Sequence, residues 1–94
     1  MLNKLDPLLH SELRLAVMSL LISLTKADFT YLKEQTKATS GNLSVQITNL
    51  EQAGYITVEK SFKGKMPQTI CTITKKGIEA FEQYVDDLKE YLKI

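Results

Sequence analysis

Few residues in this sequence could carry out catalysis or hold a metal ion. The 94 residues include one cysteine, Cys71, and one histidine, His10. A structural zinc site needs four ligands, and nucleophilic catalysis needs a nucleophile, a base and an orienting group; one cysteine and one histidine supply neither. The sequence also lacks a glycine-rich phosphate loop. We therefore expect no enzymatic activity and no cofactor, with His10 as a capping or surface residue and Cys71 as a small buried group.

Residues 40–53 carry hydrogen-bonding chemistry instead. Leu43, Ile47 and Leu50 recur at the spacing of one buried helix face. The remaining faces hold short and mostly neutral side chains, and the one charge is Glu51, near the end of the segment. Asn and Gln amides can pair with adenine, and Ser and Thr can bond to bases or phosphates, although an ordinary solvated face remains the alternative. These side chains belong to Ser40, Gly41, Asn42, Ser44, Val45, Gln46, Thr48 and Asn49.

The charged residues are balanced overall but segregated along the chain. Twelve Lys and Arg against eleven Asp and Glu give a net charge of +1. Residues 26–76 hold eight lysines and four acidic residues, a net charge of +4, whereas residues 77–94 hold two lysines and five acidic residues, a net charge of −3. Lys63 and Lys65 flank Gly64 in an expected turn, with Lys60 before it. The middle of the chain could therefore face a polyanion, and the tail could not.

The apolar pattern predicts the elements that position these groups. Two helices separated by a short break, over 30–53, form a helix-turn-helix candidate, and a hairpin follows them. Gly54 is placed to end the second of these helices. The expected elements are a helix over 11–25 capped by Ser11, a very short strand over 27–29, a helix from Thr30 to about Lys37, a helix over 40–53, strands over 55–62 and 68–74 around a turn at 63–67, and a last helix from Lys75 capped by Thr74.

Two of these helices carry more apolar surface than a small domain readily covers. The helix over 11–25 is apolar nearly all round, and the last helix has an apolar seam with spacings of 3, 4, 3 and 4. We expect the first turns of the seam to pack on the domain and its distal half, Leu88 to Leu92, to lack a partner within the chain. This predicts a homodimer that buries Val85, Leu88, Tyr91 and Leu92. The seam consists of Ile78, Phe81, Val85, Leu88 and Leu92.

The sequence from Gly41 to Ile56, which contains the Leu-x-x-Ala-Gly-Tyr-Ile run, resembles the recognition helix and first wing strand of winged-helix transcriptional regulators. The similarity is to the MarR-like and ArsR-like branches, most closely to their small single-domain members in bacteria and archaea. The segments 67–69 and 73–77 resemble the second wing strand and the start of the last helix, and the resemblance extends over about residues 5–90. It implies a mainly α fold with a small β-hairpin (α+β): one domain over 1–94, with a helix-turn-helix at about 30–53, a wing at about 55–74 and a dimerisation helix at about 75–92.

The resemblance also implies a function and its residues. A dimeric DNA-binding regulator would read an inverted repeat with the helix 40–53 in the major groove and the wing on the backbone or minor groove. Relatives often have Arg or His where Val45 and Gln46 stand, and the wing has no Arg, with Met66 beside Pro67. The implied DNA contacts are Ser40, Asn42, Ser44, Val45, Gln46 and Asn49 on the helix and Lys63 and Lys65 on the wing.

Several alternatives stay open at this level. A winged-helix module that binds protein without specific DNA binding is the main one, because the recognition helix is nearly neutral. A small-molecule effector is compatible with a dimer cleft but has no domain of its own. The apolar stretch Leu13–Leu24 is shorter than the roughly 20 residues of a membrane span, so no membrane partner is expected. A chain without disulfides is typical of the cytoplasm.

Overall fold

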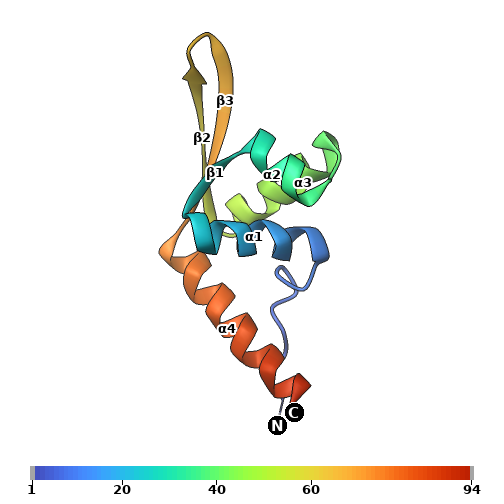
Figure 1. Ribbon diagram of the computed structural model, residues 1–94. Helices are drawn as coiled ribbons and strands as arrows, with labels where there is room; N and C mark the ends of the chain where they lie inside the picture. The colour runs from blue at the N-terminus through green and yellow to red at the C-terminus, as the bar shows by residue number, and fades with distance from the viewer. Residues whose placement is uncertain (1, 94) are drawn as a thin grey trace.

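The computed structural model describes residues 2–93. The chain folds into helices that pack around a small sheet (Figure 1). The sheet has three antiparallel strands in the order β1-β3-β2. The predicted α+β class, with an N-terminal helix, a hairpin and a long C-terminal helix, is confirmed. The elements are α1 (Glu12–Leu24), β1 (Lys26–Asp28), α2 (Phe29–Thr36), α3 (Ser40–Gln52), β2 (Ile56–Lys63), β3 (Met66–Ile73) and α4 (Lys75–Leu92).

Side-chain caps fix where three of the helices begin. Thr39 accepts a hydrogen bond from the Asn42 amide at 3.2 Å and starts α3, and Thr74 caps α4 as predicted. The predicted cap of α2 is wrong: Asp28, and not Thr30, accepts from the backbone of this helix. Asp28 has extended backbone at the end of β1, which places its carboxylate over the first turn. Ser11 occupies the cap position of α1 but makes no side-chain cap bond.

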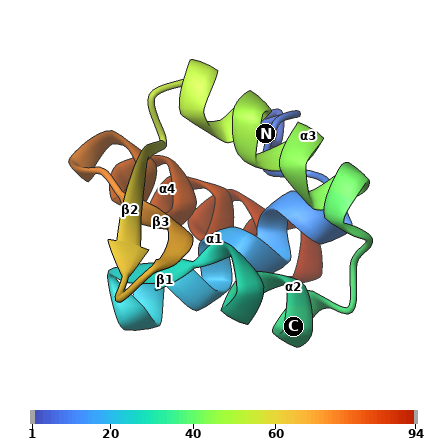
Figure 2. The same cartoon turned by 90° about the horizontal axis from the view of Figure 1, so that it is seen from above.

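The hairpin of β2 and β3 projects from the body of the domain. Its strands pair from Ile56 opposite Ile73 to Lys63 opposite Met66, so the turn is only Gly64 and Lys65, shorter than the predicted 63–67. Gly64 has a φ of 65°, the left-handed value that a two-residue hairpin turn with Gly first requires. In the view from above, α2 and α3 lie on the same side of this hairpin (Figure 2).

The core forms around α1, which lies between α4 and the pair α2–α3 (Figure 1). The central position predicted for this helix is thus confirmed. Its inner residues meet one apolar face from each neighbouring helix and the base of the hairpin, and Cys71 is buried there as expected. The buried apolar residues are Leu9, Val17, Met18, Leu21, Leu32, Leu43, Ile47, Leu50, Ile56, Cys71, Ile73 and Tyr84. Among the described residues, no helix is long and apolar enough to cross a membrane.

The face that α4 buries matches the predicted seam only in part, since Phe81 and Leu88 of the seam pack against the core. Its buried residues are Gly77, Tyr84 and Asp87, while Ile78 at the start of the seam is 37% exposed. The expectation that the distal half, Leu88 to Leu92, lacks a partner in the chain is wrong for Leu88 and for the Tyr91 hydroxyl, whereas Leu92 is 59% exposed. Asn3 donates to the Asp87 carboxylate at 3.0 Å and accepts from the Tyr91 hydroxyl at 2.7 Å.

The N-terminal segment therefore runs along α4 and covers part of it. His10 contacts the Tyr84 hydroxyl at 2.9 Å through Nδ1, and its own side chain stays exposed. Leu88 packs against the core and is half-buried. The spacing of apolar residues along α4 could not predict that the N-terminal segment covers this helix, because the two segments are more than eighty residues apart in sequence.

Candidate nucleic-acid interface

The predicted recognition helix α3 exposes most of its predicted site residues. Ser40, Asn42 and Ser44 are exposed, and Val45 is 55% exposed. These residues occupy the first two turns, where backbone N–H groups also leave the helix end positive. The two remaining predicted residues, Gln46 and Asn49, are half-buried. Thr48, which the prediction did not include in the site, is exposed beside them.

Gln46 is held by a residue that the sequence analysis missed. Arg14 of α1 donates from Nη1 to Gln46 Oε1, and from Nε to the Leu8 carbonyl at 2.5 Å. Gln46 in turn donates from Nε2 to Asn42 Oδ1 at 3.0 Å. Two predicted DNA contacts are thereby joined to each other and to the domain body. No spacing signal could find this contact, because Arg14 and Gln46 are 32 residues apart.

An open groove separates α3 from the hairpin. The polar residues that line it are Ser40, Ser44, Thr48 and Glu51 from the helix and Lys60 and Thr69 from the strands. Hydroxyl groups and the Lys60 ammonium thus line the groove, with the Glu51 carboxylate on the helix side. The hydroxyl and ammonium groups can donate to phosphate oxygens and base edges alike. The groove connects the predicted recognition helix to the predicted wing, so one ligand can contact both.

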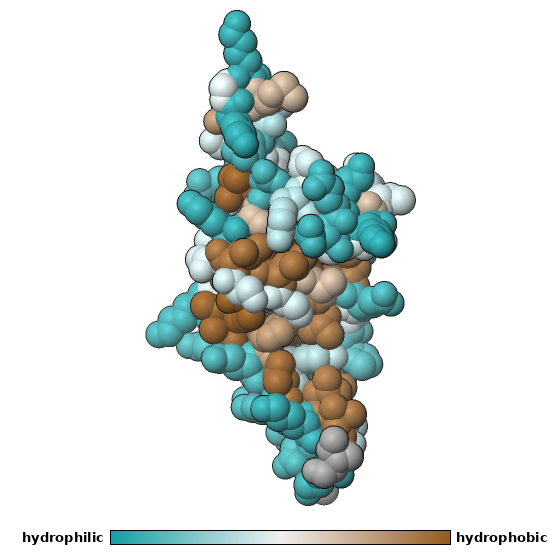
Figure 3. All heavy atoms as spheres, in the orientation of Figure 1, coloured by the Kyte–Doolittle hydropathy of each residue, from teal (hydrophilic) through white to brown (hydrophobic). Residues whose placement is uncertain are grey.

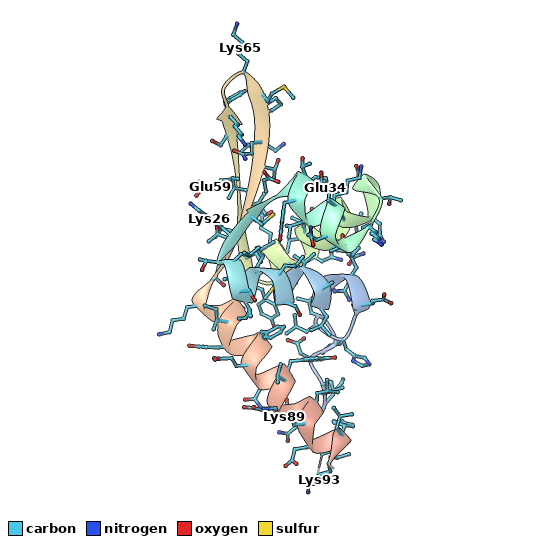
Figure 4. All side chains as sticks on the ribbon, viewed as in Figure 1. Lys26, Glu34, Glu59, Lys65, Lys89 and Lys93 are labelled. Atoms are coloured by element: carbon cyan, nitrogen blue, oxygen red, sulfur yellow. The ribbon has the colours of Figure 1, made fainter. Side chains whose placement is uncertain are left out.

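The tip of the hairpin carries cations and apolar groups together. Lys63 and Lys65 are both exposed, and Lys65 points away from the body of the domain (Figure 4). Phe62 is 73% exposed and Met66 is 70% exposed, and the prediction assigned neither of them to the site. In the β2–β3 pairing Phe62 lies opposite Pro67. Apolar side chains in this position can contact the sugar edges of a minor groove.

Charge and hydropathy divide the molecule into two ends. Hydrophilic side chains predominate at the α2–α3 end and lie beside apolar ones at the hairpin tip, and a hydrophobic band crosses the middle over α1 and the start of α4 (Figure 3). In residues 2–93 the one ion pair joins Lys93 Nζ to Glu90 at 3.9 Å, at the C-terminal end of α4. Among these residues, neither Lys63 nor Lys65 makes an ion pair within 4 Å, although the charge of Lys63 acts on Asp28. The basic end is available to a polyanion, whereas the α4 end is acidic.

The single cysteine of the sequence lies in the core. Cys71 is fully buried in β3, and burial raises the pKa of its thiol to about 11. A buried, protonated thiol is a poor nucleophile. Within residues 2–93, no three His, Cys, Asp or Glu side chains cluster as a metal site would require.

Comparison with known proteins agrees with this geometry. Residues 13–92 match the family described as winged helix DNA-binding domain. An uncharacterised protein of Methanocaldococcus jannaschii is 36% identical over 85 residues, which cover 89% of this chain and 91% of that protein.

Solved structures extend the comparison. The structure of a transcriptional regulator homologue from Pyrococcus horikoshii superposes with a TM-score of 0.86 at 29% identity, over 92% of this chain and 85% of that one. YusO of Bacillus subtilis shares the fold, with a TM-score of 0.73 at 17% identity, over 95% of this chain and 59% of YusO.

Proposed function

This chain belongs to the winged helix DNA-binding domain family, and from that premise we propose that it regulates transcription as a dimer that reads an inverted repeat. The observation that carries the proposal is that the exposed polar turns of α3 and the wing lysines lie at one end of the molecule, with the acidic helix α4 at the other. A duplex contacted by α3 would therefore meet Lys63 and Lys65 without approaching α4.

In the proposed complex α3 enters the major groove with its N-terminal half. Ser40, Asn42, Ser44 and Val45 would face base edges and phosphates, and Thr48 would join them across the groove to the hairpin. This half contains no acidic side chain, and Glu51 lies toward the opposite end of the helix. The absence of repulsion there favours a polyanionic partner.

The wing would lie on the neighbouring backbone or minor groove. Lys63 and Lys65 would neutralise phosphates, and Phe62 would pack against sugar edges. Lysine contributes a point charge. It distinguishes narrow from wide minor grooves less well than Arg, which enters narrow minor grooves better. We therefore assign affinity to the wing and sequence reading to α3.

A dimer would use the apolar surface that the domain leaves open. Ile22, Phe81 and Val85 line a groove between the end of α1 and α4, with the carboxylates of Glu82 and Asp86 also in its lining. Ile78, earlier on α4, is 37% exposed. Of the four predicted dimerisation residues, Leu92 and Tyr91 are exposed, although the Tyr91 hydroxyl bonds Asn3 of its own chain. Val85 is half-buried, and Leu88 packs against its own core. We propose that the dimer forms around the Ile22–Phe81–Val85 groove, with a two-fold axis that sets two α3 helices one DNA turn apart.

The salt dependence of binding tests the DNA-binding proposal. Binding of random-sequence duplex DNA should weaken steeply with salt, and the Lys63→Ala/Lys65→Ala variant should lower the slope of log K against log salt by about two. The matched control is Lys89→Ala/Lys93→Ala, which removes two charges from the far end of the molecule (Figure 4). The control should keep the wild-type slope.

Two results would contradict the proposal. An unchanged slope in the wing variant would place the hairpin off the DNA. A wild-type protein that binds no duplex even at low salt would favour the alternative, a module that binds protein.

A further inference from the structure

Three side chains form a hydrogen-bonded chain from α1 to the exposed start of α3. Arg14 is half-buried, and its guanidinium bonds both the Leu8 carbonyl and Gln46. Gln46 is half-buried, and Asn42, one helical turn earlier, is exposed. The chain therefore starts in the domain body and ends at the surface that we propose to face DNA.

The chemistry of arginine determines how both amides are oriented. A guanidinium has only donors, so Gln46 can face Arg14 only with its carbonyl oxygen. The Gln46 NH₂ group then lies on the other side, where it donates to Asn42 Oδ1 at 3.0 Å. Asn42 must present its oxygen to Gln46, and its own NH₂ group is left to face outward. One arginine thus fixes two amides that would otherwise rotate freely.

We propose that Arg14 is a positioning residue that makes α3 a reader of hydrogen-bond acceptors, with Asn42 Nδ2 as the reading group. This rests on the proposed function, since it requires α3 in the major groove. Guanine presents two acceptors there, N7 and O6, whereas adenine presents one acceptor and one donor. An asparagine whose oxygen points back to Gln46 presents only its NH₂ group outward, so it does not make the bidentate pairing with adenine that a free amide makes. Thymine also offers an acceptor, O4, but guanine alone offers two, so guanine is the base that we expect opposite Asn42.

The decisive variant is Gln46→Glu, which is almost the same size. The carboxylate introduced by this substitution would accept from Arg14 and has no N–H to give to Asn42. Asn42 would then rotate, donate to the carboxylate and turn its oxygen outward. Its preferred base should change from guanine to one that offers a donor, which is cytosine N4 or adenine N6.

The experiment is selection of bound sequences from a random duplex pool with the wild type and three variants. Asn42→Ala identifies the DNA position that Asn42 reads, because the preference there should vanish. At that position the wild type should favour guanine over adenine by about tenfold, and Gln46→Glu should reverse the order. Arg14→Met, which keeps an apolar stem but frees both amides, should make guanine and adenine nearly equal.

The outcomes separate this inference from the function on which it rests. A wild type that enriches no sequence and binds no duplex would reject the proposed function. A wild type with clear preferences, of which none moves in Gln46→Glu or Arg14→Met, would overturn the role of Arg14 alone. Loss of affinity for all sequences alike in Asn42→Ala would make Asn42 a phosphate contact and would also overturn it. Circular dichroism of each variant confirms that the compared proteins are folded.

Discussion

Asp28 connects three elements through a single carboxylate. It ends β1, accepts from the Tyr31 amide of α2 at 2.7 Å, and accepts from Gln68 of β3 at 3.2 Å. The backbone bond from Tyr31 is the main reason that the pKa of this carboxyl lies below its ordinary value of 3.8, and the Gln68 bond and the charge of Lys63 add to it. The ionised form is therefore the one that stabilises the fold.

The cap makes a prediction about both mutation and pH. Asp28→Ala should lower the free energy of unfolding by about 1 kcal/mol at pH 7, and Asp28→Asn should lower it less, because Asn also caps helices. Folding lowers the pKa of Asp28, so its ionic contribution is present above pH 3.8 and is lost as the pH falls through the lower, folded pKa. Urea unfolding at pH 7 and pH 3 should show the gap between wild type and Asp28→Asn narrowing in acid. A gap that widens in acid would contradict this sign.

Helix caps and helix-ending glycines could be predicted from the sequence, because they involve residues close together in the chain. Thr74 caps α4, and Gly54 has the left-handed φ of 81° expected after α3. Both depend on neighbours within a few residues. The contact of Arg14 with Gln46 and that of Asn3 with Asp87 depend on how distant segments pack, and no periodicity records them.

At the scale of elements, α4 shows why a correct helix can be assigned a partly wrong buried face. Its apolar seam and its actual buried residues, Gly77, Tyr84 and Asp87, both follow helical spacing. A buried carboxylate is not expected from sequence, yet Asp87 is 7% exposed and is satisfied by Asn3 and by Gln83. Gly77 marks the true face, because a Cβ there would lie 2.1 Å from the Tyr55 carbonyl oxygen.

The close approach of α4 to the Tyr55 backbone can be tested by changing glycine to alanine in two helices, with opposite expected effects on stability. Gly77→Ala should destabilise the domain by about 1–3 kcal/mol, because α4 must move away from the backbone that enters β2. Gly41→Ala in α3 is the matched control: a Cβ there has no neighbour within 4 Å. That variant should stabilise by about 0.5–1 kcal/mol, since Ala is the better helix former. Thermal unfolding of the pair measures both. A stable Gly77→Ala would mean that α4 does not pack as closely as described.

At the scale of the whole molecule, the domain measures 53 × 25 × 21 Å, with the wing at one end and α4 at the other. The DNA-facing and self-associating surfaces that we propose therefore do not compete. Leu88 is a poor test of association, since it packs on its own core. Ile22, which is 36% exposed in the groove with Phe81 and Val85, can be changed with less damage to the fold.

We expect the wild type to sediment as a dimer at tens of micromolar and Ile22→Lys to sediment as a monomer. A buried isoleucine contributes about 1.5–3 kcal/mol, and two-fold symmetry counts each substitution twice. The control is Leu92→Lys, at the 59% exposed end of α4. If Leu92→Lys disrupts the dimer and Ile22→Lys leaves it intact, the interface lies at the end of α4 instead. Because only a dimer presents two α3 helices about 34 Å apart, Ile22→Lys should also lose its preference for an inverted repeat over a single half-site. A wild type that stays monomeric with and without DNA would reject the dimer and, with it, the inverted repeat.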